Sequence, residues 1–232
     1  MKILVTGNRG FIGKNLCSLM DRKGLEYVGF EGDLADKESY PDGPFDAVIH
    51  LAALITHTKK WSEEEMKLIN IEAVSRICNK YKGSKIILIS TTDVSRKVLS
   101  FYAKTKLEAE KIVMGKTRKN LIIRLPSIFG PNQKQDKLIP RLIKHYFLGQ
   151  ECILNNNELR EYLFIEDATE KIIEYMNKTG IITLKGIRIK NLRLEFLIKN
   201  IYEEKIPELT FQEKKLFLQL KKCCEPYENK GK

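Results

Sequence analysis

The chain has 232 residues, of which 41 are Lys or Arg and 30 are Asp or Glu, so its formal net charge at pH 7 is +11. Hydrophobic residues make up 43% of the chain and charged residues 31%, a composition that supplies an ordinary core and excludes disordered or collagen-like protein classes. This length predicts one domain, or one domain with a small lobe attached.

The sequence contains no signal for a membrane, a disulfide framework or a metal. No run approaches the ~20 uncharged apolar residues of a spanning helix, and the apolar opening ends at Thr6, too soon for a signal peptide. Five scattered cysteines predict free thiols, and the three histidines stand at no metal-ligand spacing. We therefore expect a cytoplasmic protein without membrane contact or bound metal.

The positive charge is spread along the chain, and solvated helix faces account for most of it. Attraction of an anionic small substrate or of nucleic acid are the alternatives. No zinc finger or run of alternating basic and aromatic residues is present, so nucleic acid is the disfavoured partner.

Short apolar runs alternate with amphipathic stretches through the first 130 residues. We expect strands at 2–6, 27–30, 47–52, 85–89 and 121–125, and helices at 10–22, 62–80 and 101–115. Several of these strands are apolar on both faces, which is typical of a parallel sheet covered by helices on each side. The predicted fold class is therefore α/β, with a doubly wound parallel sheet.

The alternation of apolar runs and amphipathic stretches ends after Gly130. Helices are expected near 138–148 and 167–177, and Thr210 with Glu213 forms a capping box that opens a last helix through Lys222. The polar residues 225–232 are expected to fray.

Three glycines, Gly7, Gly10 and Gly13, lie between the first strand and the first helix. A tight turn and the close approach of a pyrophosphate both exclude a Cβ there, and the helix N-terminus offers unpaired N–H groups. An ordinary strand-to-helix turn is the alternative. Glu31 ends the next strand, where a carboxylate can hold a ribose diol, and this favours dinucleotide binding.

Tyr102 and Lys106 are four residues apart within a helical pattern, so they share one face. There the ammonium group can lower the pKa of the phenol and allow proton exchange with a substrate oxygen. Tyr81 and Lys85 have the same spacing, but a glycine interrupts them and Lys85 begins a strand. The hydroxyl side chains of 90–92 end another buried strand, where ligands bind in open α/β sheets.

Six motifs together resemble the NAD-dependent epimerase/dehydratase family of extended short-chain dehydrogenases/reductases. They follow the order of that family and cover about the first 170 residues: TGNRGFIG at 6–13, HLAA at 50–53, IST at 89–91, YAKTK at 102–106, RLPSIFGP at 124–131 and REYLFIEDA at 160–168. The resemblance implies a Rossmann-like sheet with a small C-terminal substrate-binding lobe.

The resemblance also assigns roles in catalysis. Thr91 takes the catalytic Ser/Thr position, Tyr102 the acid/base position, and Lys106 the position that holds the nicotinamide ribose. Thr92 is the alternative hydroxyl and a substrate contact, and Arg160 matches a position that holds a phosphate of nucleotide sugars.

The implied cofactor is NAD, with NADP as the alternative because Arg9 can attract the 2′-phosphate that Glu31 repels. The cofactor contacts implied by the resemblance are Gly7, Arg9, Gly10, Phe11, Ile12, Gly13, Glu31, Asp33, Leu34, Leu51, Ala52, Ala53, Tyr102, Lys106 and Pro126. His57, just past a strand end, is a further candidate for the site, with a surface loop as the alternative.

The chain is trimmed in two places relative to the family. Glu31 and Asp33 are almost adjacent, so the usual helix and strand between them are missing, and the segment between Thr91 and Tyr102 is short. The expected division is a cofactor domain over 1–130 completed by 161–180, with 131–160 and 181–232 forming a reduced substrate lobe.

The expected activity is that of an NAD(P)-dependent sugar-nucleotide epimerase or ketoreductase. Dehydration is disfavoured, because dehydratases of the family follow the catalytic threonine with two acids, and here Thr92 precedes Asp93. A homodimer through helices 62–80 and 101–115 is implied. The alternative is a catalytically retired dinucleotide-binding protein that acts as a sensor, scaffold or nucleic-acid partner, but the retained trio of Thr91, Tyr102 and Lys106 favours activity.

Overall fold

The computed structural model describes residues 1–55, 61–116, 119–155 and 157–228. The chain forms two units: Met1–Leu125 with Ala168–Leu184, and Pro126–Asp167 with Lys185–Lys232. The chain thus crosses between units after Leu125, Asp167 and Leu184, whereas the sequence-based boundaries lie at 130, 160 and 180.

The first unit contains a six-stranded sheet in the order β2-β1-β3-β4-β5-β8, with every strand parallel to its neighbours. The predicted doubly wound parallel sheet is confirmed. All residues of the inner strands β1 and β3 are buried, as their apolar sequences predict. The strands are β1 (Ile3–Thr6), β2 (Tyr27–Gly29), β3 (Ala47–His50), β4 (Lys85–Thr91), β5 (Leu121–Leu125) and β8 (Gly180–Thr183).

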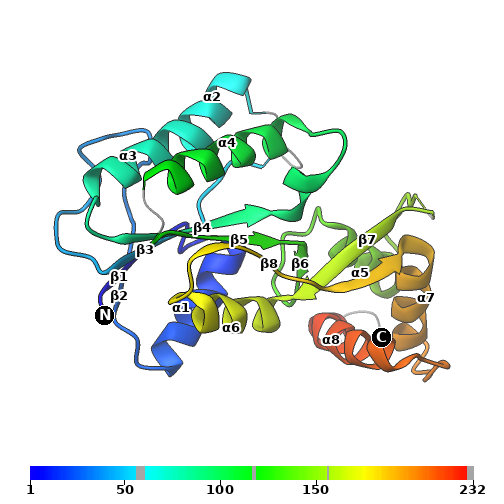
Figure 1. Cartoon of the computed structure of the whole chain (residues 1–232). Coiled ribbons are helices and arrows are strands. Elements are labelled where there is room, and N and C mark those ends of the chain that lie inside the picture. Colours follow the sequence, from blue (N-terminus) through cyan, green and yellow to red (C-terminus); the bar gives the residue numbers. More distant parts are fainter. Residues whose placement is uncertain (56–60, 117–118, 156, 229–232) are drawn as a thin grey trace. The chain divides into compact units, whose positions relative to one another are not determined.

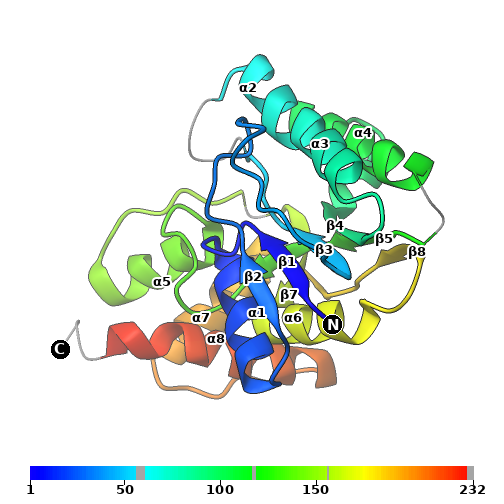
Figure 2. The ribbon, with the colours of Figure 1, turned by 90° about the vertical axis from the view of Figure 1, so that its left-hand side faces the viewer.

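Helices cover both faces of this sheet (Figures 1 and 2). The helices α1 (Phe11–Arg22) and α6 (Ile165–Tyr175) lie on one face, and α2 (Glu63–Lys67), α3 (Ala73–Lys80) and α4 (Phe101–Lys116) lie on the other. Ser62 and Glu65 form the predicted capping box at the start of α2. A π-helical turn, η1 (Leu68–Glu72), joins α2 to α3, and a 3₁₀ turn, η2 (Thr92–Ser95), follows β4.

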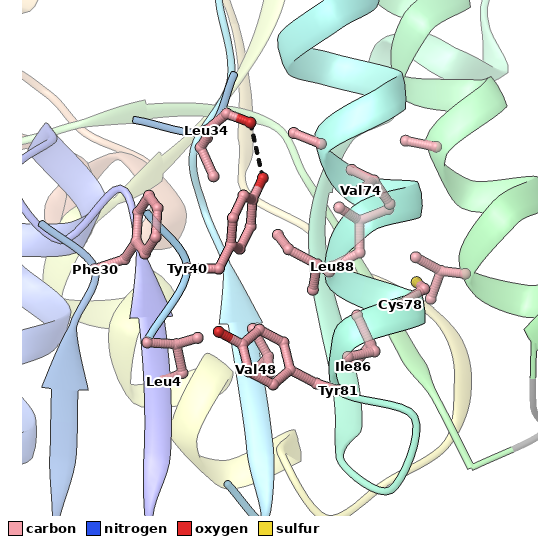
Figure 3. Close-up of a cluster of buried hydrophobic side chains, with 14 of the residues drawn as sticks. Leu4, Phe30, Leu34, Tyr40, Val48, Val74, Cys78, Tyr81, Ile86 and Leu88 are labelled. Atoms are coloured by element: carbon pink, nitrogen blue, oxygen red, sulfur yellow. Dashed lines mark hydrogen bonds between the residues drawn. The ribbon is translucent and has the colours of Figure 1, made fainter. Parts of the chain in front are cut away.

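No helix or strand forms between β2 and β3, so the predicted trimming is confirmed. This segment is fixed to α3 instead, because Arg76 donates to the Leu34 carbonyl (3.0 Å) and the Tyr81 hydroxyl donates to the Pro41 carbonyl (2.9 Å). The Tyr40 hydroxyl also bonds the Leu34 carbonyl (Figure 3). Leu34 and Tyr40 thereby join the buried cluster above β1, β3 and β4.

The second unit has a three-stranded sheet in the order β6-β7-β9, in which β6 (Ser127–Phe129) runs parallel to β7 (Leu159–Phe164) and β9 (Ile187–Lys190) runs antiparallel to it. Three further helices complete the unit: α5 (Leu138–Leu148), α7 (Asn191–Tyr202) and α8 (Phe211–Glu228). The sequence patterns did not predict these strands or α7.

The predicted end of the last helix at Lys222, with fraying from 225, is wrong for the described residues, because α8 continues to Glu228. Cys223 and Cys224 are buried and hold this extension against the unit. Pro226 is tolerated in the last turns, where it removes one backbone hydrogen bond, and the Tyr227 hydroxyl bonds Gln135 (2.8 Å). None of the described helices is both long and apolar enough to cross a membrane.

The contact between Tyr81 and the segment that replaces the missing helix and strand gives a stability prediction. Tyr81→Phe should lower the free energy of unfolding by ~1 kcal/mol, because the ring stays packed while the Pro41 carbonyl loses its donor. Urea unfolding measures this, with hydrogen exchange reporting loosened amides over 31–46. Tyr227→Phe, which removes an exposed bond, is the control, and an equal loss in both variants would contradict the prediction.

Candidate active site

The glycine loop after β1 approaches neighbouring backbone too closely for side chains. Gly7 has φ +72°, and a Cβ on it would lie 2.7 Å from the Ala52 nitrogen. A Cβ on Gly13 would lie 2.0 Å from the Gly7 carbonyl oxygen, to which the Gly10 N–H donates. No side chain caps the first turn of α1, and no acidic residue lies in it. The loop therefore fits the pyrophosphate of a dinucleotide, whose charge the helix N-terminus stabilises.

Glu31 and Arg9, whose charges favour different cofactors, contact each other. Arg9 Nη1 lies 3.3 Å from Glu31 Oε2, and the Asn8 side-chain amide donates to Glu31 Oε1 (2.8 Å). Both charged side chains are about two-thirds exposed, so water screens the pair and a ligand can replace either partner. The carboxylate thus holds the guanidinium beside the glycine loop.

The other predicted adenine contacts are partly engaged within the protein. Asp33 Oδ1 accepts the Ala35 N–H (2.8 Å), and the Leu34 side chain lies in the buried cluster. Leu51 donates its backbone N–H to the Thr6 carbonyl, continuing the ladder past β3. Ala52 then packs beside Gly7, at the same carboxyl edge of the sheet.

Tyr102 and Lys106 lie one turn apart near the start of α4. The Lys106 side chain is 2% exposed, and burial lowers the pKa of its ammonium group to about 8, although the Glu110 carboxylate acts to raise it. Burial raises the pKa of Tyr102 to about 12, and the Asp93 carboxylate adds to this rise. The expected lowering of the phenol pKa by Lys106 is therefore not found, since burial and the negative charge of Asp93 set the shift.

Tyr81 and Lys85 do not form a second site of this kind. The Tyr81 hydroxyl bonds the Pro41 carbonyl, and the Lys85 ammonium group bonds the Lys178 carbonyl. Their equal spacing in the sequence has no chemical consequence.

Thr91 is the last residue of β4, and its hydroxyl oxygen accepts the Asp93 N–H (3.1 Å), which caps η2. The hydroxyl proton remains available to a substrate oxygen. Thr92 is the first residue of η2 and no longer belongs to the strand. The strand therefore ends at Thr91, and the condition under which Thr92 would be the expected hydroxyl is not met.

Asn70 is a residue of this site that the sequence patterns missed. It is buried in the π-helical turn η1, where its side chain bonds both the N–H (2.8 Å) and the carbonyl (3.0 Å) of Leu54. It also donates to the Thr105 hydroxyl (3.1 Å), which in turn donates to the Tyr102 carbonyl (2.8 Å). One amide thus ties the segment after β3 to the helix that carries Tyr102, and a polar residue on an apolar helix face was the available signal.

His50 is also buried beside this helix. Its Nδ1 lies 2.7 Å from the Thr6 hydroxyl, while its Nε2 has no hydrogen-bond partner among the described residues. Burial, together with the charge of Lys106, lowers the pKa of His50 to about 3, so the imidazole is neutral at physiological pH.

Pro126 and Arg160 belong to the second unit. Arg160 Nε lies 2.8 Å from Glu158 Oε1. The other predicted site residues all lie in the first unit. His57 is outside the described residues, among which no group of three or more His, Cys, Asp or Glu side chains is placed to bind a metal.

Comparisons with known proteins identify the family and the fold. Residues 3–182 match the model of the NAD dependent epimerase/dehydratase family. A dTDP-D-glucose 4,6-dehydratase from Dictyostelium discoideum is 24% identical over 86% of this chain and 60% of its own length. A UDP-2-acetamido-2,6-beta-L-arabino-hexul-4-ose reductase from Pseudomonas aeruginosa is 34% identical over 56% of this chain and 36% of its own length. The chain therefore spans less than two-thirds of the length of either relative.

The structure is similar to that of a UDP-glucose 4-epimerase from Thermus thermophilus, solved in complex with NAD. The TM-score is 0.81 at 18% identity, and the match covers 98% of this chain and 99% of that one. This likeness confirms the Rossmann-like fold. With the family model covering most of the chain, these findings establish that the chain belongs to the NAD-dependent epimerase/dehydratase family.

Proposed function

We propose that the protein is an NAD-dependent epimerase or ketoreductase that acts on a nucleotide sugar. The observation that carries the proposal is the placement of Tyr102 and the buried Lys106 one turn apart on α4, with Thr91 ending the neighbouring strand β4. The glycine loop and Glu31 follow β1 and β2 at the same carboxyl edge, where ligands bind in parallel α/β sheets.

The dinucleotide, when bound, supplies hydride chemistry at a sugar carbon. Tyr102 would donate a proton to the oxygen on that carbon or take one from it, and the Thr91 hydroxyl would hold the same oxygen. Because the pKa of Tyr102 is raised to about 12, the phenol is protonated at neutral pH and ready to act as an acid. The ammonium group of Lys106 would hold the ribose and stabilise the phenolate once the proton has left.

The substrate class follows from charge. Arg160, which matches the family's phosphate-binding position, would hold a phosphate of the nucleotide, and the Glu158 contact orients its guanidinium group.

The described cysteines Cys17, Cys78, Cys152, Cys223 and Cys224 are all unpaired, which supports the reducing cytoplasm as the location.

Tyr102→Phe tests the assignment of the acid/base. We expect turnover of UDP- or dTDP-linked sugars to fall by ~10² or more, because the proton transfer is lost, while the Kd for the dinucleotide stays within about twofold. Steady-state kinetics and titration calorimetry measure the two effects. Tyr227→Phe, which removes an exposed tyrosine hydroxyl of the second unit, is the control and should keep wild-type turnover. A wild type that binds dinucleotide but turns over no nucleotide sugar would instead favour a retired, non-catalytic protein.

The Arg9–Glu31 pair leads us to propose NAD as the preferred cofactor. The Glu31 carboxylate can accept hydrogen bonds from the ribose diol of NAD. It also neutralises the guanidinium group of Arg9, which would otherwise attract the 2′-phosphate of NADP. Glu31→Ser should weaken NAD binding and strengthen NADP binding, changing the ratio of their Kd values by roughly tenfold or more. Arg9→Ala in the same background should remove the gain for NADP. Calorimetric titration with both dinucleotides decides, and tighter NADP binding by the wild type would overturn the preference.

We also propose a homodimer formed through α2, η1, α3 and α4. The helices α2, α3 and α4 lie together on one face of the sheet (Figure 1). Ile71 and Leu107, in η1 and α4, are half-buried apolar residues that a partner copy can cover. Sedimentation velocity should give twice the 26.9 kDa of one chain, and Leu107→Glu should give one chain alone. Lys14→Glu, on α1 at the other face, should stay dimeric, and a wild-type monomer at high concentration would contradict this proposal.

A further inference from the structure

A buried carboxylate on α4 is held by side chains from two strands of the sheet. Glu110 Oε1 accepts hydrogen bonds from the Ser90 hydroxyl (2.5 Å) and from Arg124 Nε (3.0 Å), and Arg124 Nη2 donates to Oε2 (2.6 Å). The Glu110 side chain is 4% exposed and that of Arg124 is 19% exposed. This bidentate ion pair is therefore largely shielded from water. In such a shielded place, the charges and the geometry of the pair act strongly on neighbouring groups.

The network joins the elements that carry the proposed acid/base and its partner hydroxyl. Glu110 lies one turn after Lys106 on α4, and Ser90 directly precedes Thr91 on β4. Arg124 on β5 is the register partner of Ser90, so the guanidinium and the hydroxyl reach the carboxylate from adjacent strands. The Glu110 carboxylate thereby fixes α4 to β4, next to Lys106 on the helix and Thr91 on the strand.

The same carboxylate acts electrostatically on Lys106, where it raises the pKa of the ammonium group against the effect of burial. Among the described residues, Glu110 on α4 acts on Lys106, and Lys106 acts on the neutral His50 of β3. Arg124 on β5 pairs with Glu110, and Asp93 of η2 acts on Tyr102, one turn before Lys106 on α4. Both oxygens of Glu110 are engaged by Arg124 and Ser90. Lys106 therefore receives only part of the charge of Glu110, which agrees with a pKa that burial still lowers to about 8.

We propose that Glu110 is a positioning residue for the reaction, and that Arg124 controls it by withholding part of its negative charge from Lys106. This inference rests on the proposed function, in which Lys106 supports Tyr102 during proton transfer. Glu110 contacts neither substrate nor cofactor in this scheme. It acts by fixing the helix that carries Lys106 and by tuning how tightly that ammonium group holds its proton.

The test measures the Lys106 pKa directly, without turnover. Lysine labelled with ¹³C at Cε is titrated by NMR, and the Lys106 resonance is identified by its loss in Lys106→Met. Glu110→Gln should move the Lys106 pKa down, because a stabilising negative charge is lost. Arg124→Gln should move it up, because a positive charge is lost and Glu110 is released toward Lys106. Each shift should be about half a unit or more.

Glu108→Gln is the matched control, since Glu108 lies on the same helix and pairs with Lys111 at an exposed position. It should leave the Lys106 pKa unchanged. Shifts in the same direction in the Glu110 and Arg124 variants, or no shift in either, would overturn the proposal, because a merely structural ion pair predicts lost stability without opposite charge effects. If an amide variant does not fold, Glu110→Asp and Arg124→Lys should give the same opposite shifts at smaller size.

Kinetics provide the second readout. In Glu110→Gln, kcat should fall by about tenfold with KM and the dinucleotide Kd nearly unchanged, and the pH limb of kcat that follows Lys106 should move to lower pH. In Arg124→Gln that limb should move to higher pH. If the two variants shift the Lys106 pKa in opposite directions but the protein turns over no nucleotide sugar, the proposed control of Lys106 by Glu110 and Arg124 holds and the proposed function is wrong. If the protein turns over substrate but the Lys106 pKa does not shift, the function holds and the proposed control is wrong.

Discussion

A lysine ammonium group buried at the carboxyl edge of a parallel sheet is the constraint on which this site depends. Removing such a charge from water costs several kcal/mol unless other groups compensate. Here the carboxylate of Glu110 compensates only in part, because Arg124 shares it, and the neighbouring His50 stays neutral. Lys106 is consequently held close to losing its proton near neutral pH, a state that an exposed lysine does not reach. The unit that surrounds it must be rigid enough to keep water out.

Close backbone contacts and buried hydrogen bonds position the segments at the carboxyl edge of the sheet. Gly7 and Gly13 occupy positions where a Cβ would overlap backbone atoms, so the close packing of the loop after β1 requires glycine at both positions. Asn70 satisfies both backbone groups of Leu54 and reaches α4 through Thr105. The π-helical turn that places this amide inside the unit is a local departure from regular helix, of the kind often found at functional sites. The regular strands and helices thus position the site residues, and the glycine loop and the π-helical turn add the contacts that hold these elements together.

The sequence predicted the parts of the fold that depend on local pattern. Strands apolar on both faces indicated a covered parallel sheet, and Ser62 with Glu65 marked a helix start that the structure confirms. In the second unit, β7 carries the charged residues Arg160 and Glu161 and gives a weak pattern, and the polar composition of 225–232 wrongly suggested fraying from 225. Spacing paired Tyr102 with Lys106, but it contained no information on burial, which decides their pKa values. Likewise, Arg9 and Glu31 suggested opposite cofactors, and only the structure pairs them.

The two pKa values together bear on how proton and hydride transfer would be coupled. With the Tyr102 phenol near 12 and the Lys106 ammonium group near 8, the phenol holds its proton more tightly than the lysine does. Protonating the oxygen of a carbonyl that receives a hydride needs only the phenol as it stands. Removing a proton from a sugar hydroxyl needs a phenolate, which forms readily only while Lys106 is charged and close. In the proposed reaction, the raised pKa of the phenol would therefore favour reduction. Oxidation, the first half of an epimerisation, would require bound ligands to strengthen the positive charge beside Tyr102. The buried Glu110–Arg124 pair would act on that charge through Lys106, as proposed above.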